Sequence, residues 1–550
     1  MSIISKVEFT KIEKFVRQIL EKIHVKNQLY KTIIIPAQLI ALHRIQKIAE
    51  KPVKYPKNKY AKKILFISVD ARHMPHTYLE GSIAKALQLR GHEVKMIICG
   101  CALNMCTTFH RVDHPPNKWS CDNCTNFSKK FYETANLPYA TYNDYLSQHE
   151  VDNIYNKVNK MTVKECEKMA YKKVNVGYHA LISVERYFRG AIPLEKDYES
   201  ILRKELVNAM ISVDVAEKAL DEKKWDLLVT SHMCYSSWGS FTDYFNEKGV
   251  KISQWATIEQ DKISIDRWKS DEYFKIYLNE IKKKKPLNKN ETDEINQFID
   301  RRKKGEQGQV QLYGFSETKK ERLEKEFNFK KFEKTYVMFP NVPWDAGLAG
   351  EKSAFKNVIE WVFYTIELFK DKPKLQLIIK IHPSELKVME SKETVKDIIK
   401  NKYPNLPENI HIIPPDTTIS PYSLFPFIDV GIVYNGTIGL EMSIQNIPVV
   451  VSYPVHYWDK GFTHDVKTRK DYLKILFENI KPLPDQQNLA KKYAYFHFIK
   501  KGIPRNWIRH DNFFTTGLKI KSFEDLMPGK NYYIDHICKY LTEGGIFQDW

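Results

Sequence analysis

The sequence lacks any hydrophobic run long enough to cross a bilayer. The longest apolar stretch near its start, Thr32–Leu42, contains Pro36, whereas a spanning helix needs about 20 apolar residues. No uninterrupted apolar stretch with a small-residue cleavage site follows the first basic residues, so we expect no signal peptide. These absences argue against a multispanning membrane protein and make a cytoplasmic location the expectation.

Repeats, low-complexity tracts and nucleic-acid signatures are absent as well. Without a recurring period the chain does not fit a solenoid. No RNA-binding signature or aromatic-basic repeat accompanies the Lys/Arg runs at 282–285 and 301–304, so we interpret these runs as solvated faces and expect no nucleic-acid partner. With 550 residues, 43% of them hydrophobic, and a mean hydropathy of -0.46, the chain can bury two or more cores.

Positive charge is abundant and unevenly placed. The net charge is +19, and residues 1–63 carry fifteen Lys or Arg against four Glu. Apolar residues from Phe15 to Ile23 recur at helical spacing among these charges. One interpretation is a basic amphipathic helix on the anionic inner face of the plasma membrane. The other is a solvated helical extension that packs on the domain after it.

The first half alternates strands with helices. A β-branched run at 64–70 precedes a helical pattern at 79–89 and a strand at 95–99. Further strands are expected at 226–230 and 252–256, and helices fill much of 141–222. This alternation predicts a parallel sheet in a Rossmann-like domain.

Two motifs in the second half are the most informative. The apolar run 378–381 ends at a His-Pro pair, and the run 428–433 ends at Asn-Gly-Thr, which opens a helix. In an open α/β sheet, ligands bind at the carboxyl ends of the strands. The first amides of a helix also suit a phosphate. Together they predict a nucleotide-sugar site formed by His382, Asn435, Gly436, Thr437 and Glu441. Lys380 lies on the same face of its strand as His382, so we expect both to act as cations toward a leaving phosphate.

The acceptor side offers several candidates for a catalytic base. A base should be poised near the working pH, which favours a His or a desolvated carboxylate. The candidates near strand ends are Asp70, His73, His76, Glu80, His232 and Asp345, the last of these in the second half. The loop 231–239 is aromatic, and we expect Tyr235 and Trp238 to form a platform for a sugar. Arg72 and His73 are expected to hold the acceptor, an acidic one in the case of Arg72.

The motifs resemble those of the bacterial capsule polysaccharide glycosyltransferases, a group that includes 3-deoxy-manno-octulosonic acid transferases and polysialyltransferases. The similarity is clearest over 336–463. It rests on the strand-His-Pro element and on Thr437-Ile438-Gly439-Leu440-Glu441, which is similar to the group's Ser/Thr-Gly-x-x-x-Glu element. Many relatives place paired hydroxyl residues where this chain has Asn435-Gly436-Thr437, which leaves the donor class open.

The resemblance implies the GT-B fold, an α/β architecture of two Rossmann-like domains with parallel sheets that face a cleft. We expect a basic helical extension at 1–60 and an acceptor domain with a helical insert at 61–325. A nucleotide-sugar domain at 326–500 and a helical segment at 501–550 that crosses back to the first domain follow. In such folds the loop at Pro415 holds the nucleobase by backbone contacts. Catalysis would need no cofactor.

Five of the eight cysteines crowd one stretch of the first half. Cys121 and Cys124 have the two-residue gap that lets both thiolates reach one zinc, and Cys101 and Cys106 are the irregular second half of such a site. A structural zinc and unpaired buried thiols are both consistent with this pattern, and a disulfide or redox role is a third interpretation.

The sequence therefore predicts a metal-independent glycosyltransferase. It would move a sugar from a nucleotide donor to a glycan or glycolipid acceptor of a surface polysaccharide. A nucleotide-sugar 2-epimerase and a teichoic-acid-type glycerophosphotransferase would share the architecture. A non-enzymatic scaffold of a membrane export machine would account for the basic N-terminus.

Overall fold

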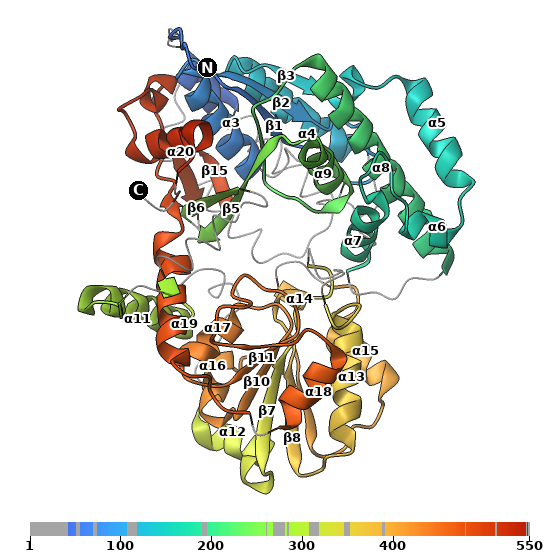
Figure 1. The fold of residues 1–550 in the computed structure, drawn as a ribbon, viewed down its shortest axis with the longest axis vertical. Coiled ribbons are helices and arrows are strands. Elements are labelled where there is room, and N and C mark those ends of the chain that lie inside the picture. The colour runs from blue at the N-terminus through green and yellow to red at the C-terminus, as the bar shows by residue number, and fades with distance from the viewer. Residues whose placement is uncertain are drawn as a thin grey trace, which may run out of the picture.

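The computed structural model describes residues 42–50, 55–69, 74–106, 118–189, 195–259, 261–267, 281–282, 285–306, 318–345, 353–387, 391–478, 480–511, 514–545 and 547. They form two α/β domains, drawn one above the other in Figure 1, each built on its own sheet. The predicted fold class, two Rossmann-like domains with parallel sheets, is confirmed. Within the described ranges, no helix combines the length and the apolar character that a bilayer span requires.

The first sheet has the strand order β13-β6-β5-β4-β1-β2-β3. Strands β1 to β5 run parallel, while β6 and β13 are antiparallel additions at one edge. The bounds are β1 (Lys63–Ile67), β2 (Glu93–Ile98), β3 (Tyr139–Thr141), β4 (Leu227–Thr230), β5 (Lys251–Glu259), β6 (Lys262–Arg267) and β13 (Ile503–Pro504). Chain order reverses between β1 and β4, so the crevice that binds ligands in such sheets lies at their carboxyl ends.

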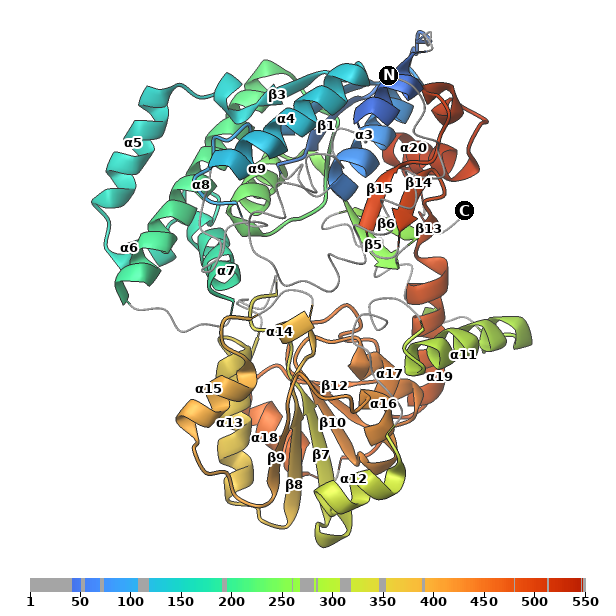
Figure 2. The same ribbon diagram turned by 180° about the vertical axis from the view of Figure 1, so that it is seen from behind.

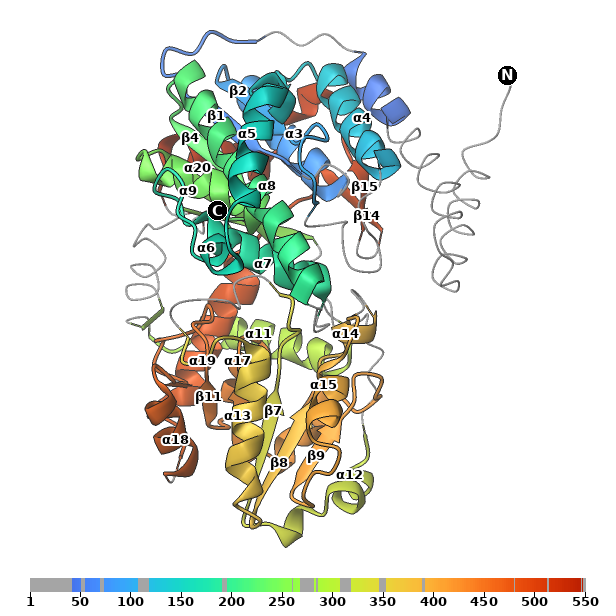
Figure 3. The same cartoon turned by 90° about the vertical axis from the view of Figure 1, so that its right-hand side faces the viewer.

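Helices cover both faces of this sheet, as parallel strands buried on both sides require (Figure 2). One face packs against α3 (Met74–Gln88), α4 (Lys118–Thr134) and α20 (Tyr532–Glu543). The other packs against α5 (Gln148–Asn159), α6 (Val163–Glu167), α7 (Val176–Phe188), α8 (Glu195–Glu222) and α9 (Ser240–Glu247). Of these, α7 lies at the end of the domain that faces the second domain (Figure 3).

The second sheet is parallel throughout, with the order β12-β11-β10-β7-β8-β9. Its strands are β7 (Lys334–Phe339), β8 (Leu375–Lys380), β9 (Ile410–Ile413), β10 (Val430–Val433), β11 (Val449–Val451) and β12 (His464–Asp465). Here the switch point lies between β7 and β10. The predicted strands at 378–381 and 428–433 are both present, and both end at this edge.

Two layers of helices enclose the second sheet. One layer consists of α13 (Val358–Lys370), α15 (Val395–Lys402) and α18 (Arg469–Phe477). The other consists of α11 (Lys289–Lys303), α12 (Lys320–Phe327), α16 (Pro421–Leu424), α17 (Ile438–Ile444) and α19 (Gln486–Ala494). A short helix, α14 (Ser384–Lys387), follows the His-Pro pair.

The helical insert predicted for the first domain belongs to the second. Ile295, Phe298 and Ile299 of α11 pack in one core with Val337 and Val433 of the second sheet. Their spacing places all three on one helix face, which the second sheet buries. The boundary predicted at residue 325 is therefore too late, because α11 and α12 already pack on the second sheet.

The closing segment also differs from its prediction. The sequence predicts helix over 501–550, but β13 joins the first sheet and β14 (Ile508–Asp511) pairs with β15 (Phe514–Leu518). Among the described residues of this segment, α20 is the one long helix. Of the basic extension, residues 1–41 lie outside the described residues, while 42–49 are helical and bury Leu42, Ile45 and Ile48 in the first-domain core.

Candidate functional site

A cavity of about 290 Å³ lies at the switch point of the second sheet, close to the lower end of the volumes usual for small-molecule sites. We call it the switch-point pocket. It is lined by Arg302, Phe339, Pro340, Asn341, Lys380, Ile381, His382, Pro383, Pro421, Tyr422, Asn435, Gly436, Thr437, Ile438 and Glu441. Six of the seven residues predicted to bind a donor line it. Pro415 does not line it, whereas Pro421 and Tyr422 of the following segment do.

Strand β8 delivers Lys380 and His382 to the pocket. Burial, with the nearby Lys380 charge, lowers the pKa of His382 to about 4, so this imidazole is neutral at neutral pH. Its Nδ1 accepts the backbone N–H of Ser384 at 3.1 Å, which leaves the proton of the neutral ring on Nε2. In the protein without a bound ligand the ring is therefore a neutral hydrogen-bond donor, and its action as a cation toward a leaving phosphate stays a prediction. Lys380 is buried.

Glu441 sits in the pocket wall with two partners that the sequence analysis missed. Arg302 Nε donates to Glu441 Oε1 at 2.9 Å, and the Tyr422 hydroxyl donates to Oε2 at 2.7 Å. Glu441 is only 2% exposed. We interpreted the run 301–304 as a solvated face, but Arg302 lies one turn after Phe298 on the buried face of α11. That four-residue spacing is the signal that could have found it.

The side chains of Asn341 and Tyr457 hold the backbone of the turn after β10. Asn341 Oδ1 accepts the N–H of Asn435 at 3.0 Å, and Asn341 Nδ2 donates to the Asn435 carbonyl. The Tyr457 hydroxyl donates to the Gly436 carbonyl at 2.6 Å. Thr437, the residue before α17, is exposed and its side chain caps nothing. These contacts shape the turn, and Thr437 is one of the residues that line the pocket.

The first-domain loop after β4 gathers aromatic rings. The His232 ring lies 4.9 Å from that of Trp238 and 6.0 Å from that of Tyr235, measured between centroids. His76 joins them, 5.7 Å from His232 and 5.0 Å from Trp255. The structure thus brings together the predicted residues His232, Tyr235 and Trp238. Asp70, Arg72 and His73 lie outside the described residues.

The backbone of this loop is strained, and buried hydrogen bonds to α7 and α8 hold it in place. Tyr235 has φ +73°, a left-handed conformation that costs a residue with a side chain about 1–3 kcal/mol and that clusters at functional sites. Ser236 Oγ donates to Glu205 Oε2 at 2.5 Å, and its N–H donates to Ser183 Oγ at 2.9 Å. Glu205 is fully buried, and burial raises its pKa to about 7. The buried network fixes the turn Tyr235–Gly239.

The loop after β7 connects the pocket with the first domain. It starts at Asn341 in the pocket and continues to Trp344 and Asp345. The Arg186 guanidinium lies 5.2 Å from the Tyr235 ring and 5.9 Å from the Trp344 ring. Asp345, a predicted catalytic residue, is exposed, and its charge reaches the Tyr235 hydroxyl. The structure places Asp345 beside the predicted acceptor loop.

The cysteine cluster forms one thiol pair. The interaction between the Cys101 and Cys121 thiols lowers the pKa of Cys101 to about 6 and raises the pKa of Cys121. In the part of the chain that the structure describes, all cysteines are free and no three His, Cys, Asp or Glu side chains are placed to hold a metal. The zinc site at Cys101, Cys106, Cys121 and Cys124 stays a prediction, and the nearby residues 107–117 lie outside the described ranges.

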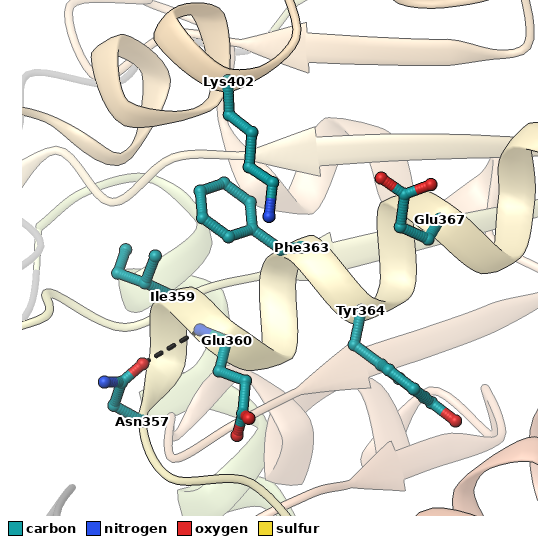
Figure 4. A pocket seen from close by; sticks show the side chains of 7 residues that line it. All are labelled: Asn357, Ile359, Glu360, Phe363, Tyr364, Glu367 and Lys402. Atoms are coloured by element: carbon teal, nitrogen blue, oxygen red, sulfur yellow. Dashed lines mark hydrogen bonds between the residues drawn. The ribbon is translucent and has the colours of Figure 1, made fainter.

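A shallower hollow on α13 contains none of the predicted site residues. It is lined by Asn357, Ile359, Glu360, Phe363, Tyr364, Glu367 and Lys402 (Figure 4). Asn357 Oδ1 accepts the N–H of Glu360 at 2.9 Å, which is a helix cap. Glu360 and Glu367 are engaged by Arg469 and Tyr403. The polar groups of this hollow therefore serve the helix and its neighbours.

No protein-family model and no curated protein matches the chain. Among solved structures it is similar to KpsC, a beta Kdo 2,4 transferase of Thermosulfurimonas dismutans, with 11% identity over 55% of this chain and 87% of that one, at a TM-score of 0.35. It is also similar to the UDP-GlcNAc 2-epimerase of Neisseria meningitidis bound to UDP-GlcNAc, with 9% identity. That match covers 79% of this chain and 96% of the other, at a TM-score of 0.25. A third similar structure is the glycosyltransferase SnogD of Streptomyces nogalater, with 11% identity. That match covers 80% of this chain and 96% of the other, at a TM-score of 0.22.

Proposed function

We propose that this protein is a glycosyltransferase that holds a nucleotide-activated sugar in the switch-point pocket. The sugar would pass to a glycan or glycolipid acceptor, of the surface-polysaccharide type, at the first-domain loop 231–239. The observation that carries the proposal is the pocket itself. A buried Lys380, a neutral His382 and the Arg302–Glu441 pair converge where an open α/β sheet binds its ligand.

Each group has a role in this proposal. The Lys380 ammonium, brought out of bulk water, stabilises the phosphate charge that grows as the sugar leaves. His382 Nε2 donates a hydrogen bond to a phosphate or sugar oxygen. Glu441 keeps acceptor capacity beyond its two protein partners, because a carboxylate has about four lone-pair sites, so it can accept from a sugar or ribose hydroxyl. No step of this scheme requires a metal ion.

The first test is nucleotide binding. Thermal unfolding of the wild type is measured with CMP, UDP, GDP and CDP. A ligand at a hundredfold its Kd adds roughly 2.7 kcal/mol of stability, so one nucleotide is expected to raise the Tm. Lys380→Met and His382→Ala should reduce the shift. Lys374→Met is the matched control, because Lys374 precedes the same strand and is 78% exposed. A folded wild type that responds to none of the four would contradict the proposal.

The second test separates the alternatives. Nucleotide release from the matching nucleotide sugar that depends on an added glycan acceptor supports transfer and excludes an epimerase. Turnover of a glycerol-phosphate donor instead would favour the glycerophosphotransferase. If His382→Ala keeps cellular function while removal of residues 1–63 abolishes it, the scaffold interpretation replaces the enzyme.

A further inference from the structure

The last turn of α7 forms the first-domain side of the junction between the domains. The Arg189 guanidinium lies 5.3 Å from the Trp344 ring, and that of Arg186 lies on the same ring at 5.9 Å. The Arg189 carbonyl accepts the N–H of Lys392 at 2.9 Å. Trp344 in turn donates to Ser391 Oγ at 3.0 Å. This turn is therefore fixed against the loops at the carboxyl edge of the second sheet (Figure 3).

Glu185 is the carboxylate on this turn. It is half-buried, and its side chain forms no hydrogen bond or ion pair with any residue that the structure describes. Its charge reaches Tyr178 and Tyr198 of the first domain and Tyr434 and Tyr453 of the second. Burial raises the pKa of all four tyrosines, so they are neutral at neutral pH. Among the described residues, no charged group is a cause of the shift in the pKa of this carboxylate.

The second-domain neighbours of Glu185 belong to the same sheet edge as the switch-point pocket. Tyr434 follows β10 directly and precedes Asn435, which lines the pocket. Tyr453 lies just after β11, and its ring stacks on that of Tyr434 at 5.3 Å. Glu185 thus lies where the first domain covers the edge at which a donor would sit.

Four other carboxylates that the structure describes near the two sites are already engaged or exposed. Glu205 accepts hydrogen bonds from Ser236 and Asn208 inside the core. Glu441 is held by Arg302 and Tyr422, and Glu80 accepts from Trp255 Nε1 at 2.8 Å. Asp345 is exposed. Burial raises the pKa of Glu185 to about 7, which is where a general base is most effective.

We propose that Glu185 is the catalytic base that takes the proton of the acceptor hydroxyl. This inference rests on the proposed function and names a residue for it. As the acceptor oxygen bonds to the anomeric carbon, its proton passes to the Glu185 carboxylate. The bond from that carbon to the phosphate oxygen breaks, and its electron pair leaves with the nucleotide.

The test measures nucleotide release from CMP-, UDP- and GDP-activated sugars between pH 5 and 9, with and without a glycan acceptor. The wild-type rate should rise with pH through about 7. Glu185→Gln should lower kcat by about 100-fold or more, lose that rise and keep the nucleotide-induced Tm shift. Glu185→Asp should recover part of the rate. Asp345→Asn, the rival carboxylate at the same junction, should keep the rise.

Two failures can be told apart. If the wild type turns over no nucleotide sugar, the proposed function is wrong and the base assignment falls with it. If the wild type turns over its donor and the pH-dependent rise survives in Glu185→Gln, or disappears in Asp345→Asn instead, only the base assignment is wrong.

A further measurement needs no substrate. A carboxyl whose pKa is raised in the folded state contributes stability below its unfolded value of about 4.5 and loses it as the pH rises through about 7. The difference in Tm between Glu185→Gln and the wild type should therefore shift in favour of the variant as the pH rises from 5 to 8. A constant difference over that range would contradict the titration that the base requires.

Discussion

At the scale of single residues, burial sets the charge state of the groups behind the His-Pro motif. It lowers the pKa of the His382 imidazole to about 4, and it raises that of the Glu385 carboxyl, three residues later, to about 8. Both shifts have the same cause, because a desolvated group favours its uncharged form. Glu385 Oε2 accepts the N–H of Val395 at 2.8 Å, while Oε1 is buried without a partner among the described residues.

Glu385 should make stability depend on pH. Its pKa in the folded state lies above the unfolded value of about 4.5, so its contribution is complete below that pH and is lost as the pH rises through about 8. Glu385→Gln keeps an acceptor for Val395 and removes this loss. The variant should gain on the order of 3 kcal/mol over the wild type between pH 5 and 9. Urea unfolding at both pH values measures the gain, and equal gains at both would contradict the assigned pKa.

Two glycines near the pocket should respond differently to a methyl group. A Cβ on Gly439 would lie 2.2 Å from the Tyr457 hydroxyl, whereas one on Gly436 would meet nothing closer than Asn341 Oδ1 at 3.6 Å. Gly439→Ala must push Tyr457 from its bond to Gly436, and such overpacking costs about 1–3 kcal/mol. Gly436→Ala is the matched control and should change the unfolding free energy by less. An equal loss of unfolding free energy in the two variants would contradict this, because it would mean that the Tyr457 side chain moves aside at no cost.

At the scale of elements, α11 shows how a helix outside the motif region completes the site. Its apolar face packs on the second sheet, and that docking carries Arg302 to Glu441. Arg302 and Glu441 are 12% and 2% exposed. An ion pair this deep has lost most of its hydration, so each partner depends on the other.

Removal of one partner should therefore be worse than removal of both. Arg302→Leu leaves the Glu441 carboxylate buried and should destabilise the protein by about 3–5 kcal/mol. The double variant Arg302→Leu/Glu441→Leu should be more stable than that single variant. Chemical denaturation of the four members of this cycle gives the coupling. A double variant less stable than Arg302→Leu would contradict this. It would mean that Glu441 still stabilises the protein without Arg302, through its hydrogen bond with Tyr422.

Strands and their edge could be predicted from the sequence, whereas the partners across elements could not. The β-branched runs at 378–381 and 428–433 are continuous, as parallel strands buried on both faces require, and the residues after them therefore meet at one edge. Arg302 and Tyr422 come from segments whose local pattern predicts a helix or a loop but not the contact with Glu441. Glu185 reads as an ordinary helix residue, because its surroundings come from Tyr434 and Tyr453, about 250 residues further along the chain.

At the scale of the whole molecule, the chain closes on itself. After the second domain, α19 and the turn that follows it rise along one side toward the first domain (Figure 1). There β13 pairs with β6, and α20 packs on α3. Lys501 pairs with Asp266 at 2.9 Å, and Trp507 Nε1 donates to Ser82 Oγ at 2.9 Å. The first-domain core is thus completed by the last fifty residues of the sequence.

This closure predicts that the two domains differ in their dependence on the closing segment. Removal of 501–550 exposes the face of α3 and the edge of β6, and it takes from the core the buried side chains of Trp507, Phe523, Leu526, Ile534, Ile537 and Leu541. The first domain should then lose its cooperative unfolding transition, while the second sheet keeps all its strands and helices. Limited proteolysis should leave a resistant fragment that starts near α11. Co-expression of 501–550 as a separate chain should restore resistance of the first domain, because the contacts need the segment and not its covalent link. A truncated protein that unfolds in one transition at the wild-type Tm would contradict this, since it would mean that the first core is complete without the segment.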